Sequence, residues 1–144
     1  MTRRVLPLVR AAIAVIEQNG RFLISRRRFT DHLGGWWEFP GGKRRAGESW
    51  EDCLRRELRE ELGITATLTT RLPPIRFRYP DREVRLEVFR CTIRAGTPKP
   101  LGCQEIRWVR AAQLRRYRFP PADRCLIHVL STGSVSLCQS VSPS

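Results

Sequence analysis

The segment from Gly42 to Ile64 constrains what this chain can form more than any other stretch does. It reads GKRRAGESWEDCLRRELREELGI, a glycine-containing loop followed by residues of high helix propensity. Ser49 is of the type that caps the first turn of a helix, and Gly63 is of the type that ends one. The segment therefore predicts a helix between these two residues, with an apolar stripe made of Trp50, Leu54, Leu58 and Leu62.

Three carboxylates, Glu57, Glu60 and Glu61, lie beside that stripe on the predicted helix. At about 100° per residue they fall within an arc of roughly 100°, where a buried face meets solvent. Like charges at these spacings repel each other, whereas a hard cation such as Mg²⁺ takes compact sets of oxygen ligands. The pattern indicates one half of a metal site. A solvated acidic helix face is the alternative, and it runs against the strongly basic composition of the chain.

The spacing of this segment resembles the Nudix box. Gly42 is followed after five residues by Glu48, and after seven more by Arg-Glu-aliphatic-x-Glu-Glu-x-Gly-aliphatic from Arg56 to Ile64. Every specified position is filled. The resemblance implies the α/β/α sandwich of that family and the hydrolysis of a nucleoside diphosphate linked to another group.

Outside the box, apolar runs and turn residues predict the remaining elements. Asn19-Gly20 predicts a hairpin, and Pro73-Pro74 predicts a break between two strands. The element order indicates an α+β or mixed α/β sandwich, in which a mixed sheet carries the box helix and a C-terminal helix. The predicted strands cover residues 8–17, 21–27, 37–40, 65–70, 75–79, 84–93 and 105–109, and the other helices cover 111–116 and 123–131.

Length and composition predict one domain at residues 1–131, followed by a flexible tail at 132–144. No apolar run is long enough to span a membrane. Five cysteines without a C-x-x-C pair predict reduced thiols in a cytoplasmic protein, which we expect to be a monomer. The net charge of +13 predicts nonspecific attraction of nucleic acids, although the arginines are spread along the whole chain and form no recognisable nucleic-acid-binding motif.

Residues 10–130 also resemble the MutT branch of the Nudix family. The similarity lies in the sequence motifs GRFLISRR, EFPGGK, YPDR and FPPAD. The resemblance implies hydrolysis of a nucleoside triphosphate to the monophosphate and pyrophosphate, with Mg²⁺ as the cofactor and Mn²⁺ as the alternative. It implies metal ligands at Glu57, Glu60, Glu61 and the backbone carbonyl of Gly41. Glu57 is also expected to orient or deprotonate the attacking water.

Three further residues complete the predicted catalytic set. Glu48 and Arg56 are expected to form a pair that holds the loop on the helix, and a phosphate contact is the alternative for Arg56. Lys43 is a candidate contact for phosphate or the leaving group, and a solvated side chain is the alternative.

The motifs outside the box imply, by the same resemblance, which residues recognise the base. Phe39 matches the position that packs against the purine, and Arg27 matches an arginine that contacts the substrate. Tyr79, Asp81 and Arg82 match the loop that closes over the ligand.

Asp123 departs from the pattern, because members specific for 8-oxoguanine carry Asn there. An ionised Asp only accepts hydrogen bonds and suits an exocyclic amine with its neighbouring ring N–H, or the N4 amine of cytosine, whereas a protonated Asp still serves an oxidised guanine. An N-cap for the last helix is its alternative role. A second departure is Gly102, where MutT-like chains often carry a glutamate. Glu105 is the nearest carboxylate, and it either reaches the site or remains a paired surface charge.

Several functions follow from these residues. The first hypothesis is an enzyme that removes oxidised guanine nucleotides such as 8-oxo-dGTP from the nucleotide pool, and the second is hydrolysis of CTP or modified dCTP. The remaining ones are an RNA 5′-end pyrophosphohydrolase and a non-catalytic nucleic-acid-binding domain. The intact set of box carboxylates favours an enzyme over the last of these.

Overall fold

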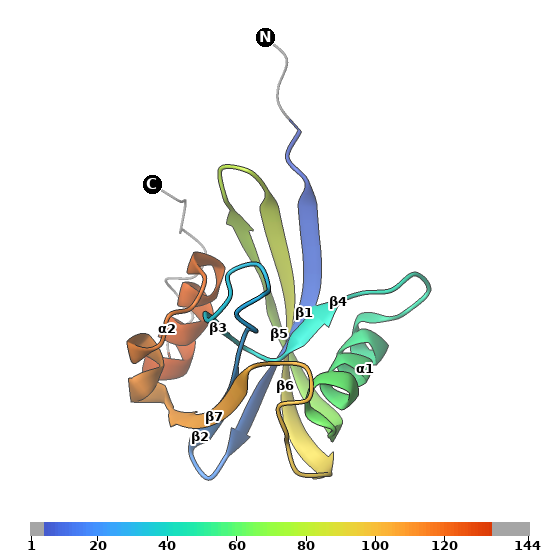
Figure 1. The fold of residues 1–144 in the computed structure, drawn as a ribbon, viewed down its shortest axis with the longest axis vertical. Coiled ribbons are helices and arrows are strands. Elements are labelled where there is room, and N and C mark those ends of the chain that lie inside the picture. Colours follow the sequence, from blue (N-terminus) through green and yellow to red (C-terminus); the bar gives the residue numbers. More distant parts are fainter. Residues whose placement is uncertain (1–4, 134–144) are drawn as a thin grey trace.

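The computed structural model describes residues 5–133. In this range the chain forms a branched mixed sheet between helices, which confirms the predicted α+β class and its sandwich of layers (Figure 1). In chain order the elements are β1 (Leu8–Gln18), β2 (Arg21–Arg26), β3 (Trp37–Glu38), β4 (Gly41–Lys43), α1 (Trp50–Leu62), β5 (Thr65–Arg78), β6 (Glu83–Ala95), β7 (Glu105–Arg110), the 3-10 helices η1 (Ala111–Arg116) and η2 (Pro121–Asp123), and α2 (Arg124–Thr132).

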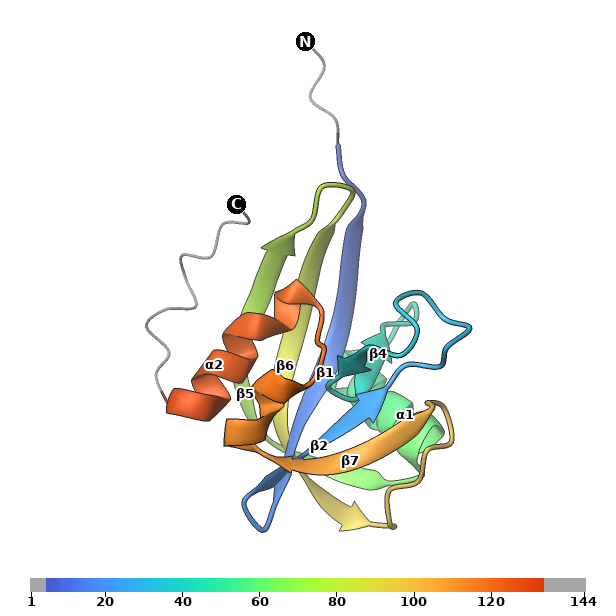
Figure 2. The same ribbon diagram turned by 60° about the vertical axis from the view of Figure 1, so that its left-hand side comes forward.

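Strand β1 is the centre of the sheet. It runs parallel to β6 from Leu8 to Ile16, and its middle pairs antiparallel with β4. Its end pairs with β2, which continues to β3 on one side and β7 on the other. Among the described residues, strand β5 pairs only with β6 and is an edge strand. The long strands β1, β6 and β5 therefore stand together, while β2 and β7 cross below them (Figure 2).

Local turn and cap signals set several boundaries where they were predicted. Asn19 and Gly20 have φ values of 52° and 74°, as a two-residue hairpin turn of type I′ requires. The Ser49 hydroxyl accepts a hydrogen bond from the Asp52 N–H at 3.0 Å, and Gly63 ends α1 with a φ of 69°.

The predicted break at Pro73-Pro74 is wrong, because β5 continues through both prolines. The register between β5 and β6 shifts between Leu72 and Ile75, so the prolines lie in an irregularity of the ladder. Proline has no N–H to donate, and an edge strand with a bulge tolerates that loss. Strand β4 was also not predicted. It forms by pairing with Ala11–Ile13, which are distant in sequence.

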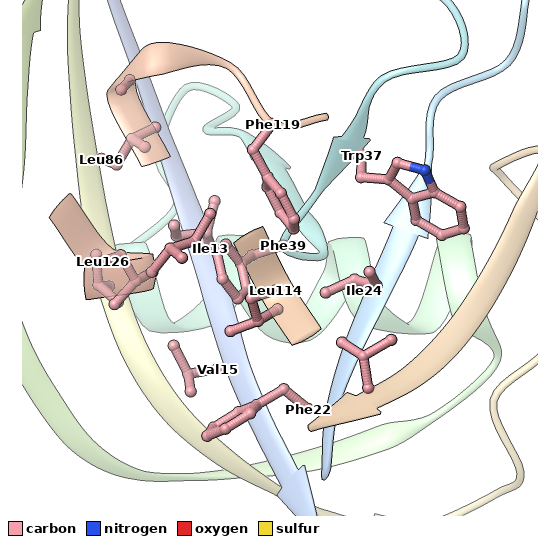
Figure 3. Packing of buried hydrophobic residues seen from close by; sticks show 14 residues of the cluster. Ile13, Val15, Phe22, Ile24, Trp37, Phe39, Leu86, Leu114, Phe119 and Leu126 are labelled. Atoms are coloured by element: carbon pink, nitrogen blue, oxygen red, sulfur yellow. The ribbon is translucent and has the colours of Figure 1, made fainter. Parts of the chain in front are cut away.

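Two clusters of buried residues form the core, one on each face of the sheet. The predicted stripe of α1 packs in one cluster with Ala12, Ala14 and Ile16 of β1. In the other cluster, residues that alternate with these along β1 pack against η1, η2 and α2 (Figure 3). The alternation gives β1 a helix-covered face on each side and accounts for the layered architecture.

Three cysteines, Cys53, Cys91 and Cys103, are free and buried, as predicted for reduced thiols. Cys125 is disulfide-bonded, which differs from that prediction. The final helix lies one residue later than predicted, at Arg124–Thr132. Most of the predicted tail, from residue 134 on, lies outside the described residues. Among residues 5–133, no helix has the length and apolar character needed to cross a membrane.

Candidate active site

A cavity of about 640 Å³ opens between the long strands, the segment that includes β3 and β4, and the entry to α2. Its apolar wall comes from β1 and β6, which present Val9, Ala11, Ile13, Val84 and Leu86. At one end α1 contributes Glu57 and Glu61, and at the other η2 contributes Asp123. The predicted phosphate and base residues therefore come together from separate elements around one space.

Two glycines let the backbone of β4 approach both β1 and α1. A Cβ on Gly42 would collide with the Glu57 carboxylate, whose Oε1 would lie only 2.7 Å away. A Cβ on Gly41 would collide with the Ala12 carbonyl oxygen and lie 2.8 Å from the Ile13 Cα. Only glycine fits at Gly41, where φ is 154° and the clash is with backbone, whereas a side chain at Gly42 would displace the Glu57 carboxylate. The box glycine thus lets the Glu57 carboxylate lie directly against the backbone of β4, which lines the cavity.

Negative charge accumulates where α1 meets β3 and β4. Burial, followed by the nearby Glu38 and Glu57, raises the pKa of Glu61 to about 8, although a hydrogen bond from the Gly41 backbone opposes this shift. Burial also raises the pKa of Glu38, against the lowering effect of the Arg27 guanidinium. A divalent cation would favour the ionised forms of these carboxylates.

The donor set fits a hard divalent cation that is only partly enclosed by protein. Glu57, Glu61 and the Gly41 backbone line the cavity. Within residues 5–133, no group of three or more acidic, histidine or cysteine side chains is placed so that it could hold a metal ion by itself. Mg²⁺ commonly binds through one or two carboxylates and completes its shell with water and substrate phosphates. The carboxylates of α1 could hold such an ion at the cavity wall.

Glu60 lies differently from the other two box carboxylates. Its side chain is 48% exposed and does not line the cavity. It forms ion pairs with Arg56 at 3.2 Å and with Arg45 at 3.6 Å. The predicted ligand Glu60 is therefore at the solvent side of the cluster in this structure.

Arg56 ties the loop before α1 to the helix. Its Nε and Nη2 donate to the two carboxylate oxygens of Glu48 at 2.7 and 2.9 Å, and Nη2 also donates to the Lys43 carbonyl at 3.1 Å. The hydrogen bonds from Arg56 and from the Arg45 backbone lower the pKa of Glu48 to about 2. Nη1 of Arg56 donates to Glu57 at 2.9 Å. The predicted pair is present, and it also orients Glu57.

Two arginines connect the walls around the cavity mouth. Arg27 donates to Glu38 at 3.0 Å and to the His32 carbonyl at 2.6 Å. Arg82 lies 3.2 Å from Nε2 of His32, and its guanidinium stacks 4.9 Å from the Tyr79 ring centroid. All five residues line the cavity. Lys43 lines it as well, whereas the exposed Asp81 does not.

The base end of the cavity is built around Phe39, Tyr79 and Asp123. Phe39 is buried and lies 5.2 Å from Phe119, ring centroid to ring centroid (Figure 3). The Tyr79 hydroxyl accepts a hydrogen bond from the Ala122 N–H at 3.1 Å. Asp123 is only 6% exposed, and burial together with the charge of Glu38 raises its pKa to about 7.

Asp123 occupies the N-cap position of α2, as the alternative role predicted, but its side chain does not cap the helix. Its side chain accepts no capping hydrogen bond from α2, and its backbone already has helical dihedral angles because η2 leads into α2. The carboxyl lines the cavity instead.

Glu105 does not reach the cavity. It pairs with Arg26 at 3.0 Å and with Arg107 at 3.3 Å, which matches the predicted alternative of a paired surface charge. Gly102 packs against α1, where a Cβ would lie 3.1 Å from the Glu61 Cα. The position of the missing glutamate is therefore close to α1 but too tight for a side chain without movement.

Two cavity residues, Glu38 and His32, were not singled out from the sequence. Glu38 precedes Phe39 in the motif EFPGGK, and the pairing of β3 with β2 places it opposite Ser25. A carboxylate within a short apolar strand was the available signal. His32 lies in the loop before β3, and no pattern in that loop distinguished it.

Carboxylates on a helix, glycine-rich backbone and flanking arginines around one cavity define a site suited to metal-assisted hydrolysis of phosphoric anhydrides. The chain belongs to the NUDIX domain family, whose model matches residues 11–129. Enzymes of this family need a divalent metal ion.

Known proteins with similar sequences and structures carry related names. An 8-oxo-dGTP diphosphatase of Proteus vulgaris is 40% identical over 57% of this chain and 73% of its own length. A CTP pyrophosphohydrolase of Escherichia coli is 31% identical over 82% of this chain and 87% of its own length. The crystal structure of a MutT protein from Methanosarcina mazei superposes with a TM-score of 0.78 at 25% identity, covering 91% of this chain and 98% of that one.

Proposed function

We propose that this protein hydrolyses nucleoside triphosphates to the monophosphate and pyrophosphate, and that oxidised guanine nucleotides such as 8-oxo-dGTP are its substrates. Similar proteins are named 8-oxo-dGTP diphosphatase or CTP pyrophosphohydrolase, so the reaction class is common to both groups and the base is the open choice. The observation that decides for oxidised guanine is Asp123, whose buried carboxyl has a pKa of about 7.

A buried carboxyl with this pKa is protonated in a substantial fraction of molecules at neutral pH. A protonated carboxyl both donates and accepts a hydrogen bond, as the Asn amide does. It can therefore satisfy the mixed donor and acceptor edge of an oxidised purine. The ionised form only accepts, and it suits an exocyclic amine with its neighbouring ring N–H or the N4 amine of cytosine, which makes CTP or modified dCTP the second candidate.

The other residues of the cavity divide the remaining tasks. Phe39 packs against the base, while Arg27, Arg82 and Lys43 hold the phosphates through charge-assisted hydrogen bonds. Glu57 and Glu61, with Glu60 at the solvent side and the Gly41 carbonyl, hold the metal ion. The bound ion would polarise the phosphate oxygens and acidify water. We favour Mg²⁺ over Mn²⁺ because all of these donors are oxygens and the site leaves room for water and phosphate.

Glu57 orients the attacking water and takes its proton. The Arg56 guanidinium, 2.9 Å from its Oε1, fixes the carboxylate in place. Glu48 in turn fixes Arg56 through two hydrogen bonds. A cytoplasmic location and a monomeric state stay predictions beside this function.

A panel of 8-oxo-dGTP, dGTP, dCTP and CTP, assayed for pyrophosphate and monophosphate, tests the proposal. We expect the highest kcat/KM for 8-oxo-dGTP in the presence of Mg²⁺, and loss of turnover with EDTA. Equal rates for 8-oxo-dGTP, dGTP and dCTP would overturn the substrate assignment. A preference for CTP would select the second candidate, and Asp123→Asn should then reduce that preference.

A further inference from the structure

The face of the sheet opposite the cavity carries a row of arginines across three neighbouring strands. Arg10 of β1 is the Cα partner of Arg85 of β6, and Arg85 is the partner of Arg76 of β5. Cross-strand partners point to the same face, and neighbouring strands lie about 4.8 Å apart. Like charges placed directly opposite each other destabilise a sheet. Sheet pairing alone therefore gives no reason for this row.

Contacts with α1 and its entry loop show which face the row occupies. The Arg10 guanidinium lies 5.2 Å from the ring centroid of Trp50, the first residue of α1. The Arg44 guanidinium lies 4.8 Å from the same ring. Val9 and Ala11, on either side of Arg10 in sequence, line the cavity on the other face. The row thus runs from the edge strand to the loop before α1 and faces away from the substrate.

Part of the charge on this face is neutralised within the protein. The buried Glu87 accepts hydrogen bonds from Arg85 at 2.9 Å and from Arg71 at 3.0 Å, and Arg71 also reaches Glu51 at 3.5 Å. Glu83 pairs with Arg78 at 3.9 Å. These contacts give Arg85, Arg71 and Arg78 structural roles.

The other three arginines keep their charge exposed. Arg10, Arg44 and Arg76 are exposed, and within residues 5–133 none of them has an ion-pair partner. The helix α1 lies against the lower part of the long strands, and their upper part rises above it (Figure 1). Stacking on Trp50 accounts for the positions of Arg10 and Arg44, but nothing comparable holds Arg76.

We propose that this surface, defined by the exposed Arg10, Arg44 and Arg76 around the paired Arg85, binds the phosphate backbone of nucleic acid. A row of guanidinium groups can donate to successive phosphates with bidentate geometry. Contacts to phosphate alone carry no sequence information, so binding is sequence-independent and sensitive to salt. A second copy of this chain is an unsuitable occupant, because two surfaces of this charge repel each other.

Occupation of this surface leaves the cavity open, because the cavity residues of β1 and β6 point to the opposite face. The protein can therefore hydrolyse free nucleotides while it is bound to a nucleic acid. This inference does not depend on which nucleotide the cavity accepts.

The test compares two triple variants of equal net charge. Arg10→Gln/Arg44→Gln/Arg76→Gln removes the exposed charges of the row and retains Arg85, which supports Glu87. Arg21→Gln/Arg94→Gln/Arg116→Gln removes three exposed arginines elsewhere and serves as the matched control. Fluorescence anisotropy with a labelled, unstructured RNA oligonucleotide bearing a 5′-hydroxyl end measures binding as a function of salt. A single-stranded DNA of the same length is a second probe.

We expect the row variant to bind either probe at least about tenfold more weakly, with the slope of log K against log[salt] reduced by about 2. The control variant should keep most of the wild-type affinity, and both variants should hydrolyse free nucleotides as the wild type does. Equal weakening in the two variants would overturn the proposal in favour of a diffuse charge effect. Inhibition of nucleotide hydrolysis by the oligonucleotide would place it in the cavity, and binding to anionic lipid vesicles without binding to either probe would indicate a membrane surface.

Discussion

The phosphate end and the base end of the cavity are built in different ways. At the phosphate end, the proposed metal-binding and catalytic side chains lie within one continuous segment, and Arg56 connects Glu48, Glu57 and the Lys43 carbonyl. At the base end, Phe39, Tyr79 and Asp123 come from a loop after β3, the end of β5 and a 3-10 helix. One end is a short-range network of charge-assisted hydrogen bonds, and the other is a packing arrangement of distant elements.

The difference suggests how one framework can keep its chemistry while its substrate changes. A change at the base end leaves the hydrogen bonds around Glu57 intact, because none of them includes a base-end residue. A change at the phosphate end alters the hydrolysis of every nucleotide, whichever base it carries. We therefore expect variants of the two ends to affect different kinetic parameters, and the following tests examine that separation.

Glu57→Gln should have the largest effect. It removes a metal ligand and the proposed base, so we expect kcat to fall by about 10³-fold or more for every nucleotide, with the ratio between nucleotides unchanged. Single-turnover assays with 8-oxo-dGTP and dCTP measure both quantities. Glu51→Gln, at a half-buried position in the first turn of the same helix and away from the cavity, is the matched control and should retain activity. A changed ratio between nucleotides would break the proposed separation.

Arg56→Gln should have the second largest effect, because it releases both the loop and the Glu57 carboxylate. We expect kcat to fall by about 10²-fold with little change in KM, as for other positioning groups. Arg56→Lys should rescue little of this loss, because an ammonium cannot make the forked contact with Glu48. Arg55→Gln is the control, since within residues 5–133 the only ion pair of the neighbouring Arg55 is with the exposed Asp52. Near-complete rescue by Lys would show that charge alone matters.

How far the sequence predicts these two ends follows from the same difference in construction. The boundaries of α1 and the Glu48–Arg56 contact depend on residues close in sequence, so cap signals and spacing were sufficient to predict them. The extent of β5 depends on its pairing with β6, and β4 forms through its pairing with β1. Local sequence patterns therefore could not predict the bounds of β5 or the presence of β4. Glu38 enters the cavity through the pairing of β3 with β2, and His32 does so through the contacts of its loop with Arg27 and Arg82.

At the base end, Asp123→Asn should change the preference for 8-oxo-dGTP over dCTP by about tenfold and should remove the pH dependence of that preference. The chemical step should stay nearly unchanged. The wild-type pKa of about 7 means that the donor form of Asp123 is present below that pH and is lost above it. We expect the preference for 8-oxo-dGTP over dCTP to fall between pH 6 and about pH 8 in the wild type. In Asp123→Asn it should stay constant, because an amide does not titrate. A pH-independent preference in the wild type would contradict the protonated-carboxyl argument.

The same carboxyl predicts a change in stability with pH. Burial raises the pKa of Asp123 from an ordinary value of 3.8 to about 7, so the folded state binds more protons than the unfolded state between these values. The free energy of unfolding therefore falls as the pH rises through this window, by a few kcal/mol in the limit of full burial. Chemical denaturation at pH 5 and pH 8 should show this loss in the wild type and a smaller one in Asp123→Asn.

Glu105→Gln should have the smallest effect, and it tests whether Glu105 belongs to the phosphate end of the cavity. Glu105 pairs with Arg26 and Arg107 on partly exposed surface, and such pairs contribute about 0–1 kcal/mol to stability. We expect kcat/KM to change less than about twofold and the midpoint of unfolding to shift only slightly. A loss of more than tenfold with Mg²⁺ present would mean that Glu105 leaves its arginines and joins the metal ligands once substrate binds. The metal ligands would then come from β7 as well as from α1 and β4, and they would no longer be confined to one segment of the chain.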